Sequence, residues 1–267
     1  MAGDKDTKPT VNEKMTAIAD AIRDKTGGTE SLTLDDMAEN IPTVYEVGKK
    51  AEYNNFWDNF NYSGRNCFSG QGWNKKTFKP NKDFYVQQDT FYYHNWQGEA
   101  YDLAAHLEEL GVTMRMGSNA RREGFYVAWF TRLPVLDFSA RTGTFDSTFY
   151  SALGSPLVTI DKIILPPEGS VTGFSSTFYN CSKLKNITFE GVIDKSISFS
   201  ASPLSVASMK NIISCLKDFS GTDSEFTYKV TFSSACITTL EAEGTTAEYN
   251  GEACTWIDLI NNKKWNS

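Results

Sequence analysis

Histidine is scarce in this chain of 267 residues, with only His94 and His106 present. A zinc site needs several Cys, His or carboxylate ligands at short spacings, and only the stretch His106-x-Glu108-Glu109 comes near such a pattern. The cysteines are also sparse, odd in number and without a Cys-x-x-Cys pair. We therefore expect no metal, no cofactor and no disulfide framework, but free, mostly buried thiols, as in a protein that folds in a reducing cytoplasm. These cysteines are Cys67, Cys181, Cys215, Cys236 and Cys254.

Positive charge is in deficit. The chain carries 26 Lys and Arg against 33 Asp and Glu, which gives a net charge of −7 and a pI near 5.0. Because phosphate binding needs a basic surface, this composition argues against a nucleic-acid partner. No stretch approaches the run of about 18 apolar residues that a membrane span requires. Residues 1–9 are polar, so we also expect no cleaved secretory signal.

The common catalytic motifs are absent from the sequence, which contains no GxSxG, GxGxxG or P-loop. Two acidic pairs, Glu108-Glu109 and Asp35-Asp36, lie at positions expected to be exposed on helices. A glycosidase needs two acids that face each other across a cleft, and adjacent acids do not provide that arrangement. We therefore predict a non-enzymatic protein, with a carbohydrate-active enzyme as the disfavoured alternative.

An irregular repeat occupies the middle of the chain. The segment Ser147-Thr-Phe-Tyr150 matches Ser176-Thr-Phe-Tyr179 residue for residue. Apolar strand-like segments recur around them, since 27 positions separate Phe138 from Leu165 and 24 separate Leu165 from Phe189. A period in the mid-twenties is typical of leucine-rich repeats, whose units bury their apolar sides only by stacking. We predict strands at residues 135–138, 163–165 and 187–189, each followed by a loop with an inward-facing Phe.

The N-terminal part predicts short helices. Met15, Ile18, Ala19 and Ile22 fall on one helical face, and this helix should end at Gly27, because glycine accepts the left-handed conformation.

Farther along, Tyr53, Phe56, Trp57 and Phe60 form an aromatic stripe at helical spacing. This stripe packs either on the following domain or on a partner subunit. It is the candidate attachment face of the chain.

A dense aromatic run, Phe91-Tyr-Tyr-His-Asn-Trp96, offers the best candidate for contact with another molecule. Alternation can bury only one side of such a run, so we predict that Tyr92, Tyr93 and Trp96 are contact residues. Exposed planar rings stack on sugars or anchor protein interfaces. The alternative is that these rings fill the inside of a solenoid coil.

The last part of the chain predicts a cap over the open end of the repeats. Ser205 is a natural N-cap for a helix over residues 209–216, which Gly221 should close. Residues 226–232 alternate as a half-buried strand does, and residues 256–265 offer a helical face.

These patterns predict a mixed α/β, β-rich fold: a short irregular leucine-rich-repeat solenoid with an N-terminal helical segment and a C-terminal α/β cap. The expected division is a flexible arm at residues 1–10, a helical attachment segment at 11–61, the solenoid at 62–204 and the cap at 205–267.

Three segments of the chain resemble known proteins. The stretch Ile18-Ala-Asp-Ala-Ile22 … Leu32-Thr-Leu34-Asp-Asp-Met37 looks like a segment common in structural tail proteins of phages and prophages from gut Firmicutes. The stretch Phe-Tyr-x-Cys181-Ser-x-Leu184-x-x-Ile187-Thr-Phe189 resembles the irregular leucine-rich repeats of the BspA-like type. The ending, from Leu204-Ser-Val-Ala-Ser208 to Lys264-Trp265, is also similar to those phage proteins.

The resemblance implies a virion protein of the tail tip, baseplate or fibre, assembled in the host cytoplasm, and it brings no catalytic residues. The implied partners are other virion proteins, further copies of the chain in a homo-oligomer, and a glycan or protein of the host cell surface. A bacterial cell-surface repeat adhesin and a capsid decoration protein stay open as alternatives. The missing secretory signal counts against the adhesin.

Overall fold

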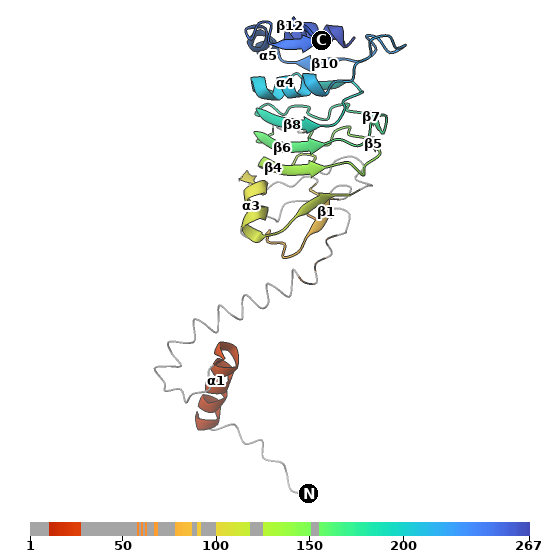
Figure 1. Cartoon of the computed structure of the whole chain (residues 1–267). Coiled ribbons are helices and arrows are strands. Elements are labelled where there is room, and N and C mark those ends of the chain that lie inside the picture. The colour runs from red at the N-terminus through yellow and green to blue at the C-terminus, as the bar shows by residue number, and fades with distance from the viewer. Residues whose placement is uncertain are drawn as a thin grey trace. The chain divides into compact units, whose positions relative to one another are not determined.

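The computed structural model describes residues 11–27, 58, 60, 62, 67–68, 78–86, 90–91, 100–117, 125–150 and 155–267 (Figure 1). The chain divides into two compact units, Met1–Phe60 and Asn61–Ser267. Among the described helices, none is both long and apolar enough to cross a membrane. The finer division of the chain into arm, attachment segment, solenoid and cap stays a prediction.

The described helix of the first unit is α1 (Val11–Thr26). It ends as predicted at Gly27, whose φ of 73° is the left-handed conformation that glycine adopts without strain. Ala19 and Ile22 are buried, but Ile18 is 44% exposed. The buried part of the predicted apolar face therefore includes Ala19 and Ile22 but not Ile18.

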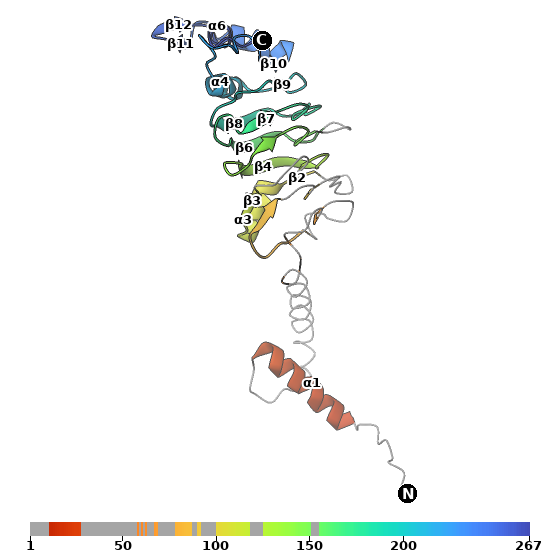
Figure 2. The same cartoon turned by 90° about the vertical axis from the view of Figure 1, so that its right-hand side faces the viewer.

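The second unit is a parallel β-solenoid of about three turns, which confirms the β-rich, mixed α/β expectation. Its successive coils contribute one strand each to a four-stranded parallel sheet (Figures 1 and 2). The register aligns Leu133, Ile160 and Ile187 across three neighbouring strands, so that equivalent apolar side chains lie above one another inside the coils. The sheet consists, in order, of β2 (Tyr101–Asp102), β4 (Phe130–Asp137), β6 (Thr159–Ile164) and β8 (Asn186–Glu190).

Shorter parallel pairs form other sides of the coils. At the start of the unit, β1 (Phe84–Val86) pairs with β3 (Met114–Met116), and α3 (Leu103–Leu110) follows β2. Farther along, β5 (Gly143–Thr144) pairs with β7 (Val171–Gly173), and β9 (Ile197–Phe199) pairs with β10 (Val230–Phe232).

A column of phenylalanine rings fills the inside of the coils. Each ring comes from one turn and stacks on the ring of the next, with centroids 5.7 Å apart for Phe125–Phe149, 5.3 Å for Phe149–Phe178 and 4.7 Å for Phe178–Phe199. Phe91 precedes this column and Phe232 follows it. All six rings are buried. The predicted inward-facing Phe is therefore confirmed, and its burial contributes a large share of the hydrophobic stabilisation.

The free edge of β8 is paired by side chains of α4 (Val206–Cys215). The Ile187 amide donates to Ser208 Oγ at 2.9 Å. The amide of Phe189 donates to Asn211 Oδ1 at 2.6 Å, while Asn211 Nδ2 donates back to the Phe189 carbonyl at 3.0 Å. Asn211 thus pairs with the strand edge as another strand would, and it satisfies backbone groups that otherwise stay open.

The remaining C-terminal elements are α5 (Ser234–Glu241), the antiparallel pair β11 (Ala247–Tyr249) and β12 (Glu252–Cys254), and α6 (Trp256–Asn262). Ser205 caps α4 as predicted, with its side chain accepting from the Ser208 amide. Two expectations are wrong here. The helix ends at Cys215, well before Gly221, and the strand is confined to Val230–Phe232. Phe226 instead lies in a turn with a φ of 55° and is 47% exposed.

Replacement of one ring of the phenylalanine column should be costly. Phe178→Ala removes a buried ring that stacks on both Phe149 and Phe199, and it should lower the free energy of unfolding by about 3–5 kcal/mol. The matched control is Phe226→Ala, which removes the same ring from an exposed turn and should cost less than about 1 kcal/mol. Urea denaturation followed by circular dichroism measures both, and equal losses would contradict the column as the core.

The five cysteines are free, as expected, and should differ sharply in reactivity. Burial raises the pKa of Cys181 to about 12, and its thiol donates to the Phe149 carbonyl at 3.2 Å. Since the thiolate is the reactive form, Ellman's reagent at about pH 8 should modify the half-buried Cys254 first and Cys181 only after unfolding in urea. Peptide mapping by mass spectrometry gives the order. A Cys254→Ser variant should lose the fast phase, and rapid native labelling of Cys181 would show that its burial is wrong.

Candidate functional site

The residues predicted as contact and attachment sites fall largely outside the described part of the chain. Tyr92, Tyr93 and Trp96 lie outside it, as do Tyr53, Phe56 and Trp57. Phe60 is described and is half-buried. In sequence, Tyr92 directly follows Phe91, and this is the position that tyrosine also takes after Phe125, Phe149 and Phe178.

A second aromatic column, made of tyrosines, lies outside the phenylalanine column. Tyr126 and Tyr150 stack with centroids 4.9 Å apart and planes 5° apart, and Tyr150 and Tyr179 stack at 4.8 Å and 10°. Neighbouring strands of a sheet lie about 4.8 Å apart. When two coils are in register, equivalent tyrosine rings are therefore separated by about the distance at which two aromatic rings stack. We call Tyr126, Tyr150 and Tyr179 the tyrosine column.

The matching turns of two coils hold Tyr150 and Tyr179 in the same orientation. Ser147 and Ser176, each three positions before a tyrosine, have φ values of 57° and 53°. The amide of each tyrosine donates to the carbonyl of that serine. The amide of Ser147 donates to the Ser175 carbonyl and that of Phe149 to the Thr177 carbonyl, which fastens one turn to the next. The repeated Ser-Thr-Phe-Tyr sequence therefore encodes this turn.

The tyrosine column ends at Tyr179. In the next coil Phe199 continues the inner column, but the residue after it is Ser200, so no ring from the described part of the chain covers the outer face of Tyr179. Among the described residues Tyr179 stacks on Tyr150 alone, and it is 55% exposed.

A pocket of about 300 Å³ lies beside the uncovered ring. We call it the Tyr179 pocket; its described lining is Ser176, Phe178, Tyr179, Asn180, Ser198, Ser200 and Ala201. None of these residues carries a charge. Its volume lies at the lower end of the range of small-molecule sites, which is about 300–1,000 Å³.

The backbone is also open at this level of the solenoid. Within the described residues β7 pairs with β5 and β9 with β10, while no strand pairing joins β7 to β9. An adjoining hollow of about 500 Å³ lies along this gap. It shares Ser176 and Ser198 with the Tyr179 pocket and extends to Lys195, Tyr228 and Lys229. The two hollows thus lie next to each other and share part of their lining.

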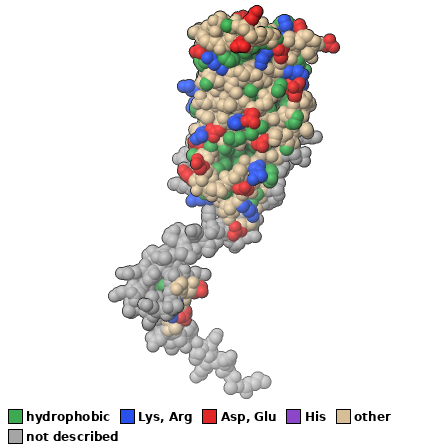
Figure 3. All heavy atoms as spheres, viewed as in Figure 1, with side chains coloured by type: hydrophobic (Ala, Val, Ile, Leu, Met, Phe, Trp, Pro, Cys, Tyr) green, Lys and Arg blue, Asp and Glu red, His purple; other side chains and the backbone are tan. Residues whose placement is uncertain are grey.

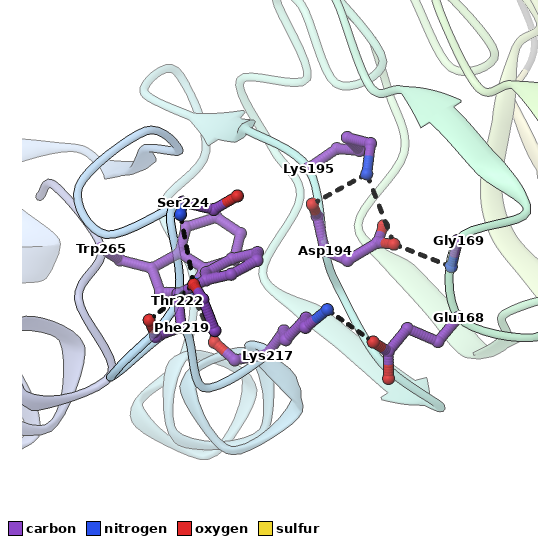
Figure 4. A network of polar contacts seen from close by, with 9 residues as sticks. All are labelled: Glu168, Gly169, Asp194, Lys195, Lys217, Phe219, Thr222, Ser224 and Trp265. Carbon is purple, nitrogen blue, oxygen red and sulfur yellow. Dashed lines mark hydrogen bonds and ion pairs between the residues drawn. The ribbon is translucent and has the colours of Figure 1, made fainter.

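A polar network joins three successive turns (Figure 4), and its Lys195 also lines the adjoining hollow. Lys217 Nζ lies 2.7 Å from Glu168 Oε1, and this hydrogen bond raises the pKa of Lys217. The buried carboxylate of Asp194 accepts from the Gly169 amide at 2.8 Å and lies 3.4 Å from Lys195 Nζ. Each carboxylate has a cationic partner, so we interpret the network as fastening the turns together.

Charges on the outer face of the sheet are paired. Arg132 binds Asp161 through two hydrogen bonds of 2.7 and 3.0 Å, which raise the pKa of the arginine, and Lys162 lies 2.8 Å from Glu190. In the view of Figure 3, positive and negative side chains are interspersed over the solenoid. This face therefore presents no patch of one sign.

The residues considered for metal or acid–base chemistry do not assemble in the described part of the chain. It contains no group of three or more His, Cys, Asp or Glu side chains placed to hold a metal ion. His106 is buried, with Nε2 2.6 Å from the Phe78 carbonyl, which indicates a structural hydrogen bond. Glu108 and Glu109 are adjacent and exposed on α3, and His94 lies outside the described residues.

No family model, no curated protein and no solved structure matches this chain. Any assignment of function therefore has to rest on its residues and their geometry. The sequence predicts exposed aromatic residues, Tyr92, Tyr93 and Trp96, as contacts to another molecule, but it does not single out Tyr179. One sequence feature does indicate the uncovered ring of Tyr179. Phenylalanine is followed by tyrosine in Phe149-Tyr150 and Phe178-Tyr179, but by serine in Phe199-Ser200.

Proposed function

We propose that this chain is a non-enzymatic structural protein of a bacteriophage virion, located in the tail tip, baseplate or fibre, whose solenoid contacts the host surface. The observation that carries the contact role is the tyrosine column, which ends in an uncovered ring above an open pocket. Exposed aromatic faces next to hydroxyl groups are suited to binding another molecule. The ring supplies apolar contact area, and the hydroxyls supply hydrogen bonds that select the ligand. The placement in a virion rests on the resemblance of the segments around Ile18–Met37 and Leu204–Gly221 to phage tail proteins.

The proposal treats the coils as irregular leucine-rich repeats of the BspA-like type. It is supported by the recurring unit of a strand, a turn and an inward Phe at spacings in the twenties. It further treats residues 205–267 as the terminal cap. The pairing of Asn211 with the open edge of β8 supports this role, since a solenoid end must be covered.

In this proposal the first unit attaches the chain to the particle. It contains the candidate attachment face Tyr53, Phe56, Trp57 and Phe60, and it is separate from the solenoid in its internal contacts. The partners are other virion proteins and further copies of the chain in a homo-oligomer, assembled in the host cytoplasm. The solenoid then meets a glycan or protein of the host surface.

Removal of residues 1–60 should separate attachment from folding. The truncated chain, residues 61–267, keeps a compact unit and should retain a cooperative urea transition. It should be missing from purified particles, in which mass spectrometry detects the full-length chain at a fixed copy number. Antibody labelling in electron micrographs should place the full-length chain on the tail.

Two outcomes would contradict the proposal. Incorporation of the truncated chain at the full-length copy number would refute attachment by the first unit. Recovery of the full-length chain from the bacterial surface in cells that make no particles would favour the adhesin, and labelling of the head would favour capsid decoration. The full-length variant Tyr85→Ala, which alters an exposed residue of the second unit, should be incorporated normally.

A further inference from the structure

We propose that the Tyr179 pocket binds the pyranose ring of a neutral oligosaccharide, with the sugar lying on the outer face of Tyr179 in the place of the missing tyrosine. This inference deepens the host-contact part of the proposed function and rests on it.

The shape of the pocket follows from the spacing of the tyrosine column. The ring centroids of Tyr150 and Tyr179 are 4.8 Å apart, so each coil contributes one layer to the column, and that layer is one ring thick. The inner rings Phe178 and Phe199 lie 4.7 Å apart, so the inner column keeps this spacing into the next turn. In the next coil Ser200 follows Phe199, at the position where earlier coils have a tyrosine. One ring of the tyrosine column is therefore absent there. A six-membered sugar ring stacked on Tyr179 can therefore take the place of the absent tyrosine ring.

The lining supplies polar groups at the edge of that space. Among the described residues, the Ser176 hydroxyl and the Asn180 amide have no hydrogen-bond partner, and both line the pocket. The hydroxyls of Ser198 and Ser200 lie 3.3 Å apart and bond to each other. A pyranose has an apolar face of axial C–H bonds and a rim of hydroxyls, so one face fits the aromatic ring while the rim meets these groups.

The same lining disfavours other occupants. A phosphate or carboxylate ligand would find no cation among the described residues of the pocket, since Lys195 and Lys229 line the adjoining hollow instead. The aromatic side chain of a protein partner would stack equally well on Tyr179. However, its apolar edge would lie against the free hydroxyl of Ser176 and the free amide of Asn180, and burying them unpaired is costly.

The adjoining hollow favours an oligosaccharide over a single sugar. Ser176 and Ser198 line both the Tyr179 pocket and the adjoining hollow, so a ring bound on Tyr179 can continue into a space of about 500 Å³. Tyr228 and Lys229 also line this hollow and offer further polar contacts to a second or third ring.

The test uses the full-length chain with cellotriose, triacetylchitotriose and lactose as probes, and methyl β-glucoside as a single ring. Saturation-transfer difference NMR should show the strongest transfer to the C–H protons on one face of a sugar ring. Isothermal titration calorimetry should give a Kd of about 0.1–10 mM for at least one oligosaccharide and weaker binding for the single ring.

Four variants separate stacking from folding. Tyr179→Ala should weaken binding by about tenfold or more, whereas Tyr179→Phe keeps the ring and should stay within about threefold of the wild type. Ser200→Tyr restores the missing ring, so it should abolish binding while leaving the Tm unchanged or raised. Tyr85→Ala, which removes an exposed tyrosine from β1, should bind as the wild type does.

The proposal is overturned if no probe binds, or if binding survives both Tyr179→Ala and Ser200→Tyr. It is also overturned if Tyr179→Ala leaves sugar binding intact but dissociates an oligomer in light-scattering measurements, because Tyr179 then contacts a second copy. These results are independent of the particle experiment. A chain that binds no sugar can still be found on the tail, and a sugar-binding chain absent from particles would refute the virion assignment alone.

Discussion

The stacking of one phenylalanine ring on the next sets the geometry of the whole second unit. Phe125, Phe149, Phe178 and Phe199 come from four different coils, and each buries its faces only because the neighbouring coil supplies a ring. This requirement forces the coils into register, and the register in turn pairs the strands β4, β6 and β8. The tyrosine column on the outside is a consequence of the same alignment.

Much of this architecture is visible in the sequence because its determinants are local. The identical Ser-Thr-Phe-Tyr segments at Ser147 and Ser176 reveal the repeat, and Ser205 marks the start of α4 through ordinary N-cap chemistry. Gly27 follows α1 and Gly111 follows α3, each with a positive φ, and a glycine at a helix end is a signal that the sequence shows directly. At these positions prediction from sequence succeeds because one residue decides the local conformation.

Other features depend on contacts that the sequence does not display. In β4 the buried residues Phe130, Leu133 and Leu136 are spaced by three, so the alternation that normally marks a strand is missing. Phe226 continues an apolar alternation but turns out to solvent with a left-handed backbone. The Tyr179 pocket is still harder to predict from the sequence. Ser200 is recognised as the position of the absent tyrosine only once Phe199 is known to stack on Phe178. The sequence predicts exposed tyrosines at Tyr92 and Tyr93, whereas the exposure of Tyr179 follows only from the stacking of the coils.

The replacement of tyrosine by serine at the end of the outer column has an evolutionary consequence. Codons for these two amino acids can differ in a single base, so one nucleotide change can supply the absent ring at Ser200 or remove the ring at Tyr150. Because the inner phenylalanines carry the stability, such a change leaves the scaffold in place. Such changes can therefore move the uncovered tyrosine along the stack one coil at a time, without building a new fold.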